Sequence, residues 1–119
     1  MAERTIHLPN NILHRDWFGL PGFTDVVLWL AFHVNDKEEL SSYWHGCTVA
    51  PRSVEVEPAQ IADETGTTVQ GVKIILDALR NAGEISYEES IAHLGGRSTA
   101  IKVYTITLKN YDCETNTLY

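Results

Sequence analysis

The sequence predicts an α+β fold, a winged helix-turn-helix with a small antiparallel sheet and N-terminal helices. Residues 58–83 have the pattern of two helices joined by a short turn with glycine, which is typical of a helix-turn-helix. Residues 84–90 and 99–108 have the pattern of two strands around a glycine pair, which predicts a hairpin. Residues 24–34 are apolar on nearly every helical face and are predicted to form a helix at the centre of the core. A helix-turn-helix followed by a hairpin is the arrangement of a winged helix.

Length and composition are those of one soluble globular domain. The 119 residues are 44% hydrophobic and 21% charged, and we expect a single domain, 1–119, with flexible ends at 1–9 and 112–119. Cys47 and Cys113 form no CxxC pair, so we expect reduced thiols. No apolar run approaches the about 20 residues of a membrane span, and the N-terminus lacks a signal-peptide core. We therefore expect a cytoplasmic protein without membrane contact.

The chain begins with an extended segment and a short helix. Residues 5–8 alternate and are compatible with a short strand. Asn10 or Asn11 can cap a helix that continues to Phe18. The apolar members of this helix are Ile12, Leu13, Trp17 and Phe18.

The next helix is the strongest helical signal in the sequence. We expect it to begin at Thr24, after a turn at residues 19–22, and to end before Asn35. Asp25 lies in its first turn, where the helix dipole favours a carboxylate. We expect His33 to be a packed core residue. The apolar residues of the helix are Val26, Val27, Leu28, Trp29, Leu30, Phe32 and Val34.

A polar connection and a short strand lead into the helix-turn-helix. Residues 36–46 are predicted to be an irregular connection, in which Trp44 is either a core residue or exposed at an interface. Residues 54–57 alternate and predict a strand. In winged helices such a strand often pairs with the hairpin.

Local signals define the helix-turn-helix. Pro58 suits the first position of a helix, and Gly66 suits a left-handed cap at its end. Thr67 or Thr68 can cap the second helix, and Gly83 ends it. The expected core residues are Ile61 and Ala62 on the first helix, and Val69, Val72, Ile75, Leu76 and Leu79 on the second.

The predicted hairpin turns at Gly95 and Gly96. Its second strand alternates imperfectly around Tyr104, which indicates either a bulge or burial on both faces. The polar segment after the hairpin is expected to fray, in line with the flexible end at 112–119.

The order of these pieces resembles the phage-type winged-helix proteins related to the N-terminal domain of DnaD-like replication-initiation proteins. The resemblance covers about residues 6–112 and is carried by HRDWF, VVLWLAFHVN, IADETGTTVQGVKIILDALRNAGEI and KVYTITLKNYD. It implies a role in DNA replication or its regulation in phage, plasmid or other mobile elements. The chain departs from the usual pattern at Thr67, where an apolar residue is common, and in the scarcity of Lys and Arg on the second helix.

A winged helix of this kind binds double-stranded DNA with its second helix and its hairpin. Gln70 can pair with an adenine edge and Lys73 can reach a guanine or a phosphate. On the hairpin, Lys102 and Arg97 are the best candidates, because the adjacent glycines let Arg97 reach the backbone or the minor groove. The complete set of predicted DNA-binding residues is Thr67, Thr68, Gln70, Lys73, Arg97 and Lys102, to which Arg52 and Arg80 can add charge.

Other observations favour a protein-interaction or dimerisation module that does not contact DNA. The net charge of −7 disfavours broad nonspecific binding to nucleic acids, although a small basic stripe can lie on an acidic protein. Gln70 and Lys73 also fit the solvated face of an amphipathic helix. Ile74 lies beside the DNA-facing positions, where an apolar residue suits a protein contact better than a phosphate. Glu88 and Glu89 would repel phosphates if they shared the face of Lys102.

Motifs for catalysis are missing from the sequence. The five histidines are scattered, and none has a partner at metal-ligand spacing. There is no GxxxxGK[ST] phosphate loop, no GxGxxG after a strand and no GxSxG elbow. We therefore expect that the protein is not an enzyme, with no catalytic residues, no metal ligands and no cofactor.

Overall fold

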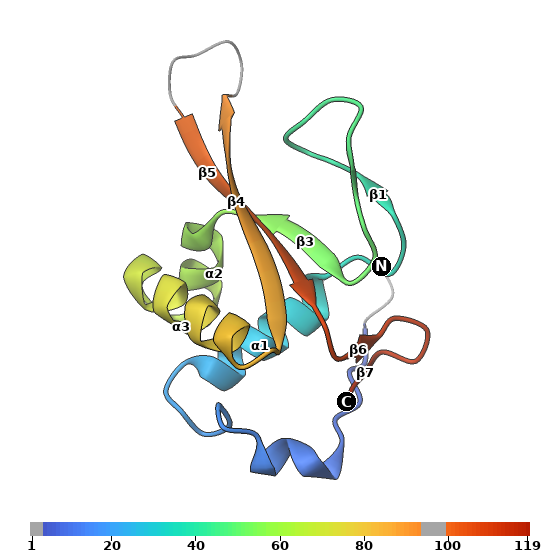
Figure 1. The fold of residues 1–119 in the computed structure, drawn as a ribbon, viewed down its shortest axis with the longest axis vertical. Coiled ribbons are helices and arrows are strands. Elements are labelled where there is room, and N and C mark those ends of the chain that lie inside the picture. Colours follow the sequence, from blue (N-terminus) through green and yellow to red (C-terminus); the bar gives the residue numbers. More distant parts are fainter. Residues whose placement is uncertain (1–3, 94–99) are drawn as a thin grey trace.

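Three α-helices and a three-stranded antiparallel sheet form the framework of the described structure (Figure 1). This computed structural model describes residues 4–93 and 100–119. The helices are α1 (Phe23–His33), α2 (Pro58–Thr65) and α3 (Val69–Asn81), and a 3₁₀ helix, η1 (Asn10–His14), precedes them. The main strands are β3 (Ser53–Val56), β4 (Ile85–His93) and β5 (Ala100–Leu108). Short strands form two further pairs, β1 (Glu39–Leu40) with β2 (Thr48–Val49) and β6 (Tyr111–Asp112) with β7 (Thr117–Leu118).

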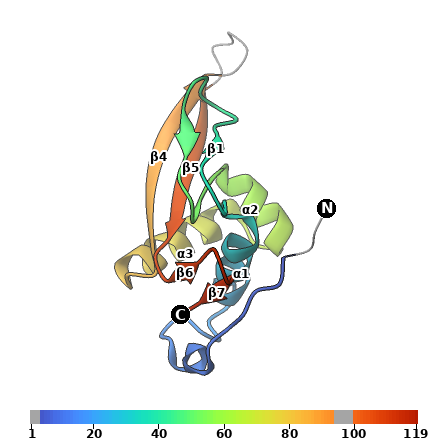
Figure 2. The same ribbon diagram turned by 90° about the vertical axis from the view of Figure 1, so that its right-hand side faces the viewer.

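The main sheet has the strand order β3-β5-β4. The prediction that a strand before the helix-turn-helix pairs with the hairpin is therefore confirmed. Strand β3 pairs with only part of β5, from Ser53 opposite Thr107 to Val56 opposite Tyr104. Strands β4 and β5 continue beyond it as a two-stranded ribbon that extends away from the helices (Figures 1 and 2).

The irregular alternation around Tyr104 reflects burial on both faces of the sheet. Each described residue of β4 pairs with one residue of β5, so this part of the hairpin has no bulge. The neighbouring residues Val103 and Tyr104 point to opposite faces, and both are buried. On the face of Val103, Ser53 is also buried, and its hydroxyl lies 2.6 Å from that of Thr107 in a hydrogen bond.

The helices cover one face of the sheet and the β1–β2 segment lies on the other. Val56, Tyr104, Ile106 and Leu108 belong to the same buried cluster as residues of α1, α2 and α3. On the opposite face, the hydroxyl of Ser41 donates to Glu55 at 2.8 Å. The prediction of an irregular polar connection is thus only partly right, because a small hairpin forms within it. Trp44 is half-buried there.

Helix α1 lies in the core, as predicted, but two of its residues do not. Five of its side chains are buried: Val26, Val27, Trp29, Leu30 and Ala31. Phe32 is exposed, and so is His33, which stacks on Trp29 instead of packing into the core. The prediction for His33 was wrong because His33 and Phe32 lie on the solvent side of α1, while Leu30 and Ala31 in the same turn face the core.

The caps of the helix-turn-helix agree with the sequence. Pro58 is the first residue of α2, and Gly66 ends the helix with φ of 72° in the left-handed region. Thr68 caps α3, and its hydroxyl accepts a hydrogen bond from the backbone N–H of Gly71. One core prediction was wrong: Val69 is exposed, because it is the first residue of α3 and precedes the turn that packs inward.

The N-terminal helix is shorter than predicted. Only residues of η1 are helical, so the turn does not continue to Phe18. Neither asparagine caps it, because Pro9 occupies the N-cap position and no side chain bonds there. Ile12 and Trp17 are buried, whereas Leu13 and Phe18 are exposed.

The segment after the hairpin is packed, in contrast to the flexible end expected at 112–119. Strands β6 and β7 pair with each other, and His7 pairs with Thr117. Tyr111 is only 1% exposed and Leu118 is buried, so both belong to the main core. The polar composition of residues 112–119 led to the wrong prediction, because the buried side chains of Tyr111 and Leu118 anchor this small hairpin.

Candidate nucleic-acid interface

The first turns of α3 and the outer part of β5 line one open groove. Val69 and Lys73 contribute from α3, and Ile101 and Lys102 contribute from β5. Glu57, Pro58 and Ala59, at the N-terminal end of α2, complete the lining, so one carboxylate also borders the groove. The fold thus places the helix and the hairpin that the sequence singled out against the same hollow. Two of the predicted site residues, Lys73 and Lys102, lie in it.

The exposed face of α3 presents a mixed set of side chains. Gln70 is exposed, and Lys73 is half-buried along the groove. Ile74 is 58% exposed, which confirms that it lies outside the core. Among the described residues, Lys73 has no carboxylate within ion-pair distance. Its ammonium group is therefore available to an external anion.

The two threonines of the turn have structural roles. The hydroxyl of Thr67 is half-buried and bonds with that of Thr65 at 2.9 Å, and its N–H donates to the carbonyl of Ala62. Thr67 is therefore engaged within the protein, contrary to its predicted place on the DNA-facing surface. Thr68 is exposed and its oxygen caps α3, so only its hydroxyl proton remains for an external acceptor.

Lys102 on the hairpin already forms an ion pair within the protein. Lys102 lies 3.5 Å from the carboxylate of Glu89 on the neighbouring strand, and both side chains are largely exposed. Glu88 alternates to the opposite face and lines a different hollow, with Thr105 and Thr107. Of the two glutamates that the sequence flagged, only Glu89 interrupts the basic surface. Arg97, the other predicted hairpin residue, lies outside the described residues.

The two additional arginines do not enlarge this surface. Arg52 is at the far end of the sheet, where its guanidinium donates to the carbonyl of Lys109. Arg80 is in the last turn of α3, 3.2 Å from Asp77, and its Cζ lies 4.6 Å from the ring centroid of Tyr87. The positive charge that faces the groove therefore comes from Lys73 and Lys102 among the described residues.

A tyrosine pair joins α3 to the sheet, and the sequence did not predict it. Tyr87 and Tyr104 stack with ring centroids 5.1 Å apart, and the hydroxyl of Tyr87 donates to Asp77. Burial and this hydrogen bond raise the pKa of Tyr87 to about 12. Burial, followed by the charge and hydrogen bond of Glu89, raises the pKa of Tyr104. Both phenols are therefore neutral near pH 7, and Tyr87 donates its hydrogen bond to Asp77 on α3.

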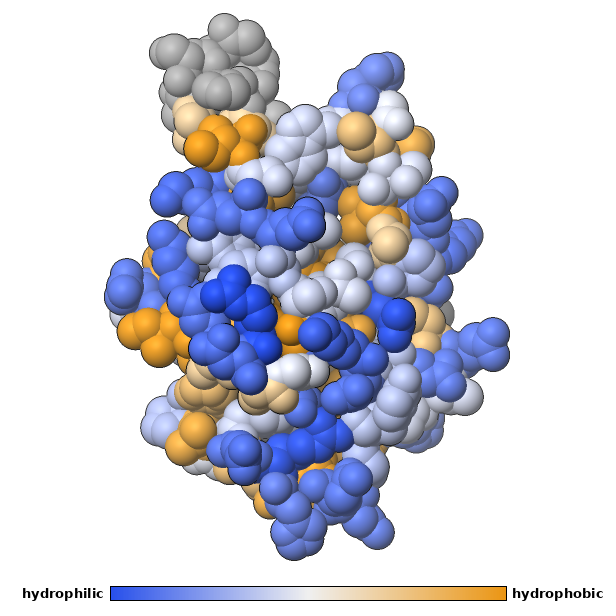
Figure 3. Space-filling model, in the orientation of Figure 1, coloured by the Kyte–Doolittle hydropathy of each residue, from blue (hydrophilic) through white to orange (hydrophobic). Residues whose placement is uncertain are grey.

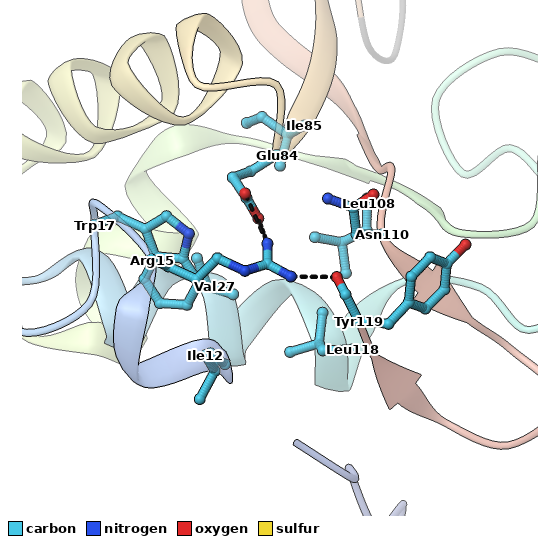
Figure 4. Close-up of a pocket in the computed structure, with 10 residues that line it drawn as sticks. All are labelled: Ile12, Arg15, Trp17, Val27, Glu84, Ile85, Leu108, Asn110, Leu118 and Tyr119. Carbon is cyan, nitrogen blue, oxygen red and sulfur yellow. Dashed lines mark hydrogen bonds and ion pairs between the residues drawn. The ribbon is translucent and has the colours of Figure 1, made fainter. Parts of the chain in front are cut away.

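A second hollow lies at the opposite end of the molecule (Figure 4). Arg15 donates to both carboxylate oxygens of Glu84 at 2.7 Å, and it also donates to the carbonyl of Tyr119. The indole N–H of the buried Trp17 has no hydrogen-bond partner among residues 4–93 and 100–119. The enclosed volume is about 10 Å³, about the size of one water molecule. This hollow is a packing junction between η1, β4 and the C-terminal hairpin, and nothing in the sequence indicated it, because the paired residues are 69 positions apart.

Other features complete the description of the surface. In the described part of the chain, no group of three His, Cys, Asp or Glu side chains is placed to hold a metal ion. None of the helices in residues 4–93 and 100–119 has the length and apolar character needed to cross a bilayer. Comparison of the chain with family models, with curated proteins and with solved structures finds no match.

Proposed function

We propose that the protein is a winged-helix protein that binds double-stranded DNA through α3 and the β4–β5 hairpin. The observation that carries this proposal is the common groove of α3 and β5, with Lys73 and Lys102 inside it. The order α1-β3-α2-α3-β4-β5, with β3 beside β5, supports a winged helix-turn-helix. In such folds the N-terminal part of the second helix enters the major groove.

Each exposed group has a distinct role in this proposal. Gln70 reads a base edge, because its amide matches the donor and acceptor pattern of adenine. Lys73 and Lys102 neutralise phosphates on the two sides of the groove. Arg97 extends the contact from the hairpin. Phosphate must compete with Glu89 for Lys102, since the two side chains are 3.5 Å apart. The resemblance to DnaD-like proteins supports a role in replication initiation or regulation in a phage or other mobile element.

The test is the salt dependence of binding to a duplex selected from a random DNA pool. Each lysine that neutralises a phosphate contributes about −0.9 to the slope of log affinity against log salt. The Lys73→Ala/Lys102→Ala variant should therefore lose about 1.8 from the steepness of the slope, together with affinity at low salt.

A matched control removes the same charge elsewhere. Lys37 and Lys109 are exposed and neither lines the groove. The Lys37→Ala/Lys109→Ala variant should keep most of the wild-type slope. Equal slopes for the wild type and the Lys73/Lys102 variant would exclude this groove as the DNA site.

A second candidate function is a protein-interaction module, and exposed apolar side chains favour it. Ile74 on α3 and Ile91 on β4 are 58% and 56% exposed, and Val69 is exposed at the groove. Hydrophobic atoms reach the surface over α3 and next to the hairpin tip (Figure 3). If this function is correct, Ile74→Asp should abolish a concentration-dependent dimer or a partner complex, and no selected duplex should bind even at low salt.

A further inference from the structure

A second open groove lies between α1 and α2, which pack against each other (Figure 2). Its floor consists of Leu28 and Phe32 from α1, with Asp25 at one end and Glu64 on the α2 side. It shares no lining residue with the candidate DNA groove. Its volume is about 430 Å³, whereas one water molecule needs about 10–15 Å³ on the same measure. The groove is therefore of a size that accepts several side chains of a partner.

The floor of this groove is aromatic and open to solvent. Phe32 is 47% exposed, although it belongs to the helix that forms the centre of the core. Next to it, the rings of Trp29 and His33 stack with centroids 3.9 Å apart and an angle of 8° between their planes. A ring face of this kind attracts apolar groups and also cations, in particular guanidinium.

The carboxylate of Glu64, which is held by Trp29 and His33, borders this aromatic surface. The indole N–H of Trp29 donates to Oε1 of Glu64 at 3.2 Å, and Nε2 of His33 lies 3.7 Å from the same oxygen. These contacts orient the carboxylate, while Oε2 accepts no hydrogen bond from any residue in 4–93 or 100–119. Asp25 adds a second exposed carboxylate, and the lining contains no Lys or Arg. The groove therefore combines an apolar floor with negative charge on both sides.

We propose that this α1–α2 groove binds a basic amphipathic segment of a partner protein. The apolar side chains of the segment cover Phe32 and Leu28. An arginine lies against the exposed ring of His33, which stacks on the buried Trp29, and donates to the free oxygen of Glu64, a charge-assisted contact for which the planar guanidinium is well suited. A second copy of this chain is a poor occupant, because its net charge of −7 opposes an acidic groove. The occupant is thus a cationic protein segment bound as a helix or strand in a groove.

The experiment is a titration of the ¹⁵N-labelled chain with a synthetic amphipathic peptide that has leucines on one face and arginines on the other. We expect saturable binding, with amide shifts in α1 and α2. Glu64→Gln removes the charge but keeps an oxygen to accept from Trp29, so it should weaken binding by about tenfold or more. Phe32→Ala should weaken it as well, and its exposed position keeps the fold intact.

The control variant is Glu114→Gln, which removes the charge of an exposed carboxylate on the C-terminal hairpin. It should bind the peptide as the wild type does. The proposal is overturned if both glutamine variants behave alike, if a peptide with glutamates in place of the arginines binds equally well, or if the arginine peptide does not bind. A dimer of the free chain that Phe32→Ala dissociates would also overturn it, in favour of a second copy. None of these results depends on DNA binding.

Discussion

The inner and outer halves of the β4–β5 hairpin have different physical roles. In the inner half, Ile85, Ile106 and Leu108 are buried beneath the helices, and β3 forms a third strand. In the outer half the ribbon has two strands, and Ile91 and Lys102 are exposed. The same hairpin therefore contributes to the core at one end and to the candidate interface at the other. Ala92 and Val103 are still buried in the outer half, but mutations at the exposed Ile91 and Lys102 can address the candidate interface without opening the core.

Helix α3 is divided in the same way, around its axis. Its buried stripe consists of Val72, Ile75, Leu76 and Leu79. Its other side exposes Gln70 and Ile74. Because the two stripes are on one rigid helix, packing of the first fixes the position of the second. This is how a small domain can hold a binding surface without extra supporting elements.

The largest expected effect is at Ile106, in the inner half. Ile106→Ala leaves a cavity at a side chain that is 0% exposed, so it should lower the free energy of unfolding by about 2–5 kcal/mol. Ile91→Ala in the outer half is the matched control and should change it by no more than about 0.5 kcal/mol. Urea denaturation followed by circular dichroism measures both. Equal losses would show that the outer half also supports the core.

A smaller effect is expected at Thr68, which the sequence offers both as a helix cap and as a DNA-binding residue, and which caps α3 in the structure. Thr68→Ala removes the acceptor for the N–H of Gly71 and should cost about 1 kcal/mol of unfolding free energy. Thr68→Ser keeps the hydroxyl and should restore most of it. If the alanine variant were as stable as the wild type in urea, the cap would have no structural role and Thr68 would belong with the binding residues.

The smallest effect concerns the pH dependence of the inner half. Tyr87 has a pKa of about 12 when folded, compared with 10.0 for the unperturbed side chain, because burial and the hydrogen bond to Asp77 favour the neutral phenol. The folded chain therefore holds this proton more tightly, and its contribution to stability is complete below about pH 10 and lost as the pH rises towards 12.

Ultraviolet titration of tyrosinate measures this shift directly. Asp77→Asn should lower the pKa of Tyr87 towards its ordinary value, because both the charge and the accepting carboxylate are removed. Tyr87→Phe identifies which step of the titration belongs to Tyr87. An unchanged titration in the Asp77 variant would mean that burial alone sets the pKa.

Local signals in the sequence predicted the helix-turn-helix well. Pro58, Gly66 and Thr68 act within a few residues, through backbone conformation and a cap, so their effect can be read from the chain itself. Lys73 and Lys102, which the sequence named separately as DNA-binding candidates, line one groove in the structure.

Long-range contacts could not be predicted in this way. The packing of Tyr111 and Leu118, the pairing of Arg15 with Glu84, and the exposure of His33 all depend on which segments meet in the fold. The ion pair of Lys102 with Glu89 has a similar origin, since strand register decides it. The sequence therefore named Lys102 as a DNA-binding candidate but could not show that its charge is already paired with Glu89.

The buried hydroxyl pair of Ser53 and Thr107 has a consequence for how the strands find their alignment. Val103 and Tyr104 are both apolar and adjacent, so a slip of β5 by one residue would still place an apolar side chain on each face at this point. Hydrophobicity alone therefore selects the alignment of β5 only weakly here. A slipped strand would, however, leave the hydroxyl of Ser53 in the interior without its partner. The hydrogen bond of Ser53 with Thr107 therefore favours the native alignment of β3 with β5.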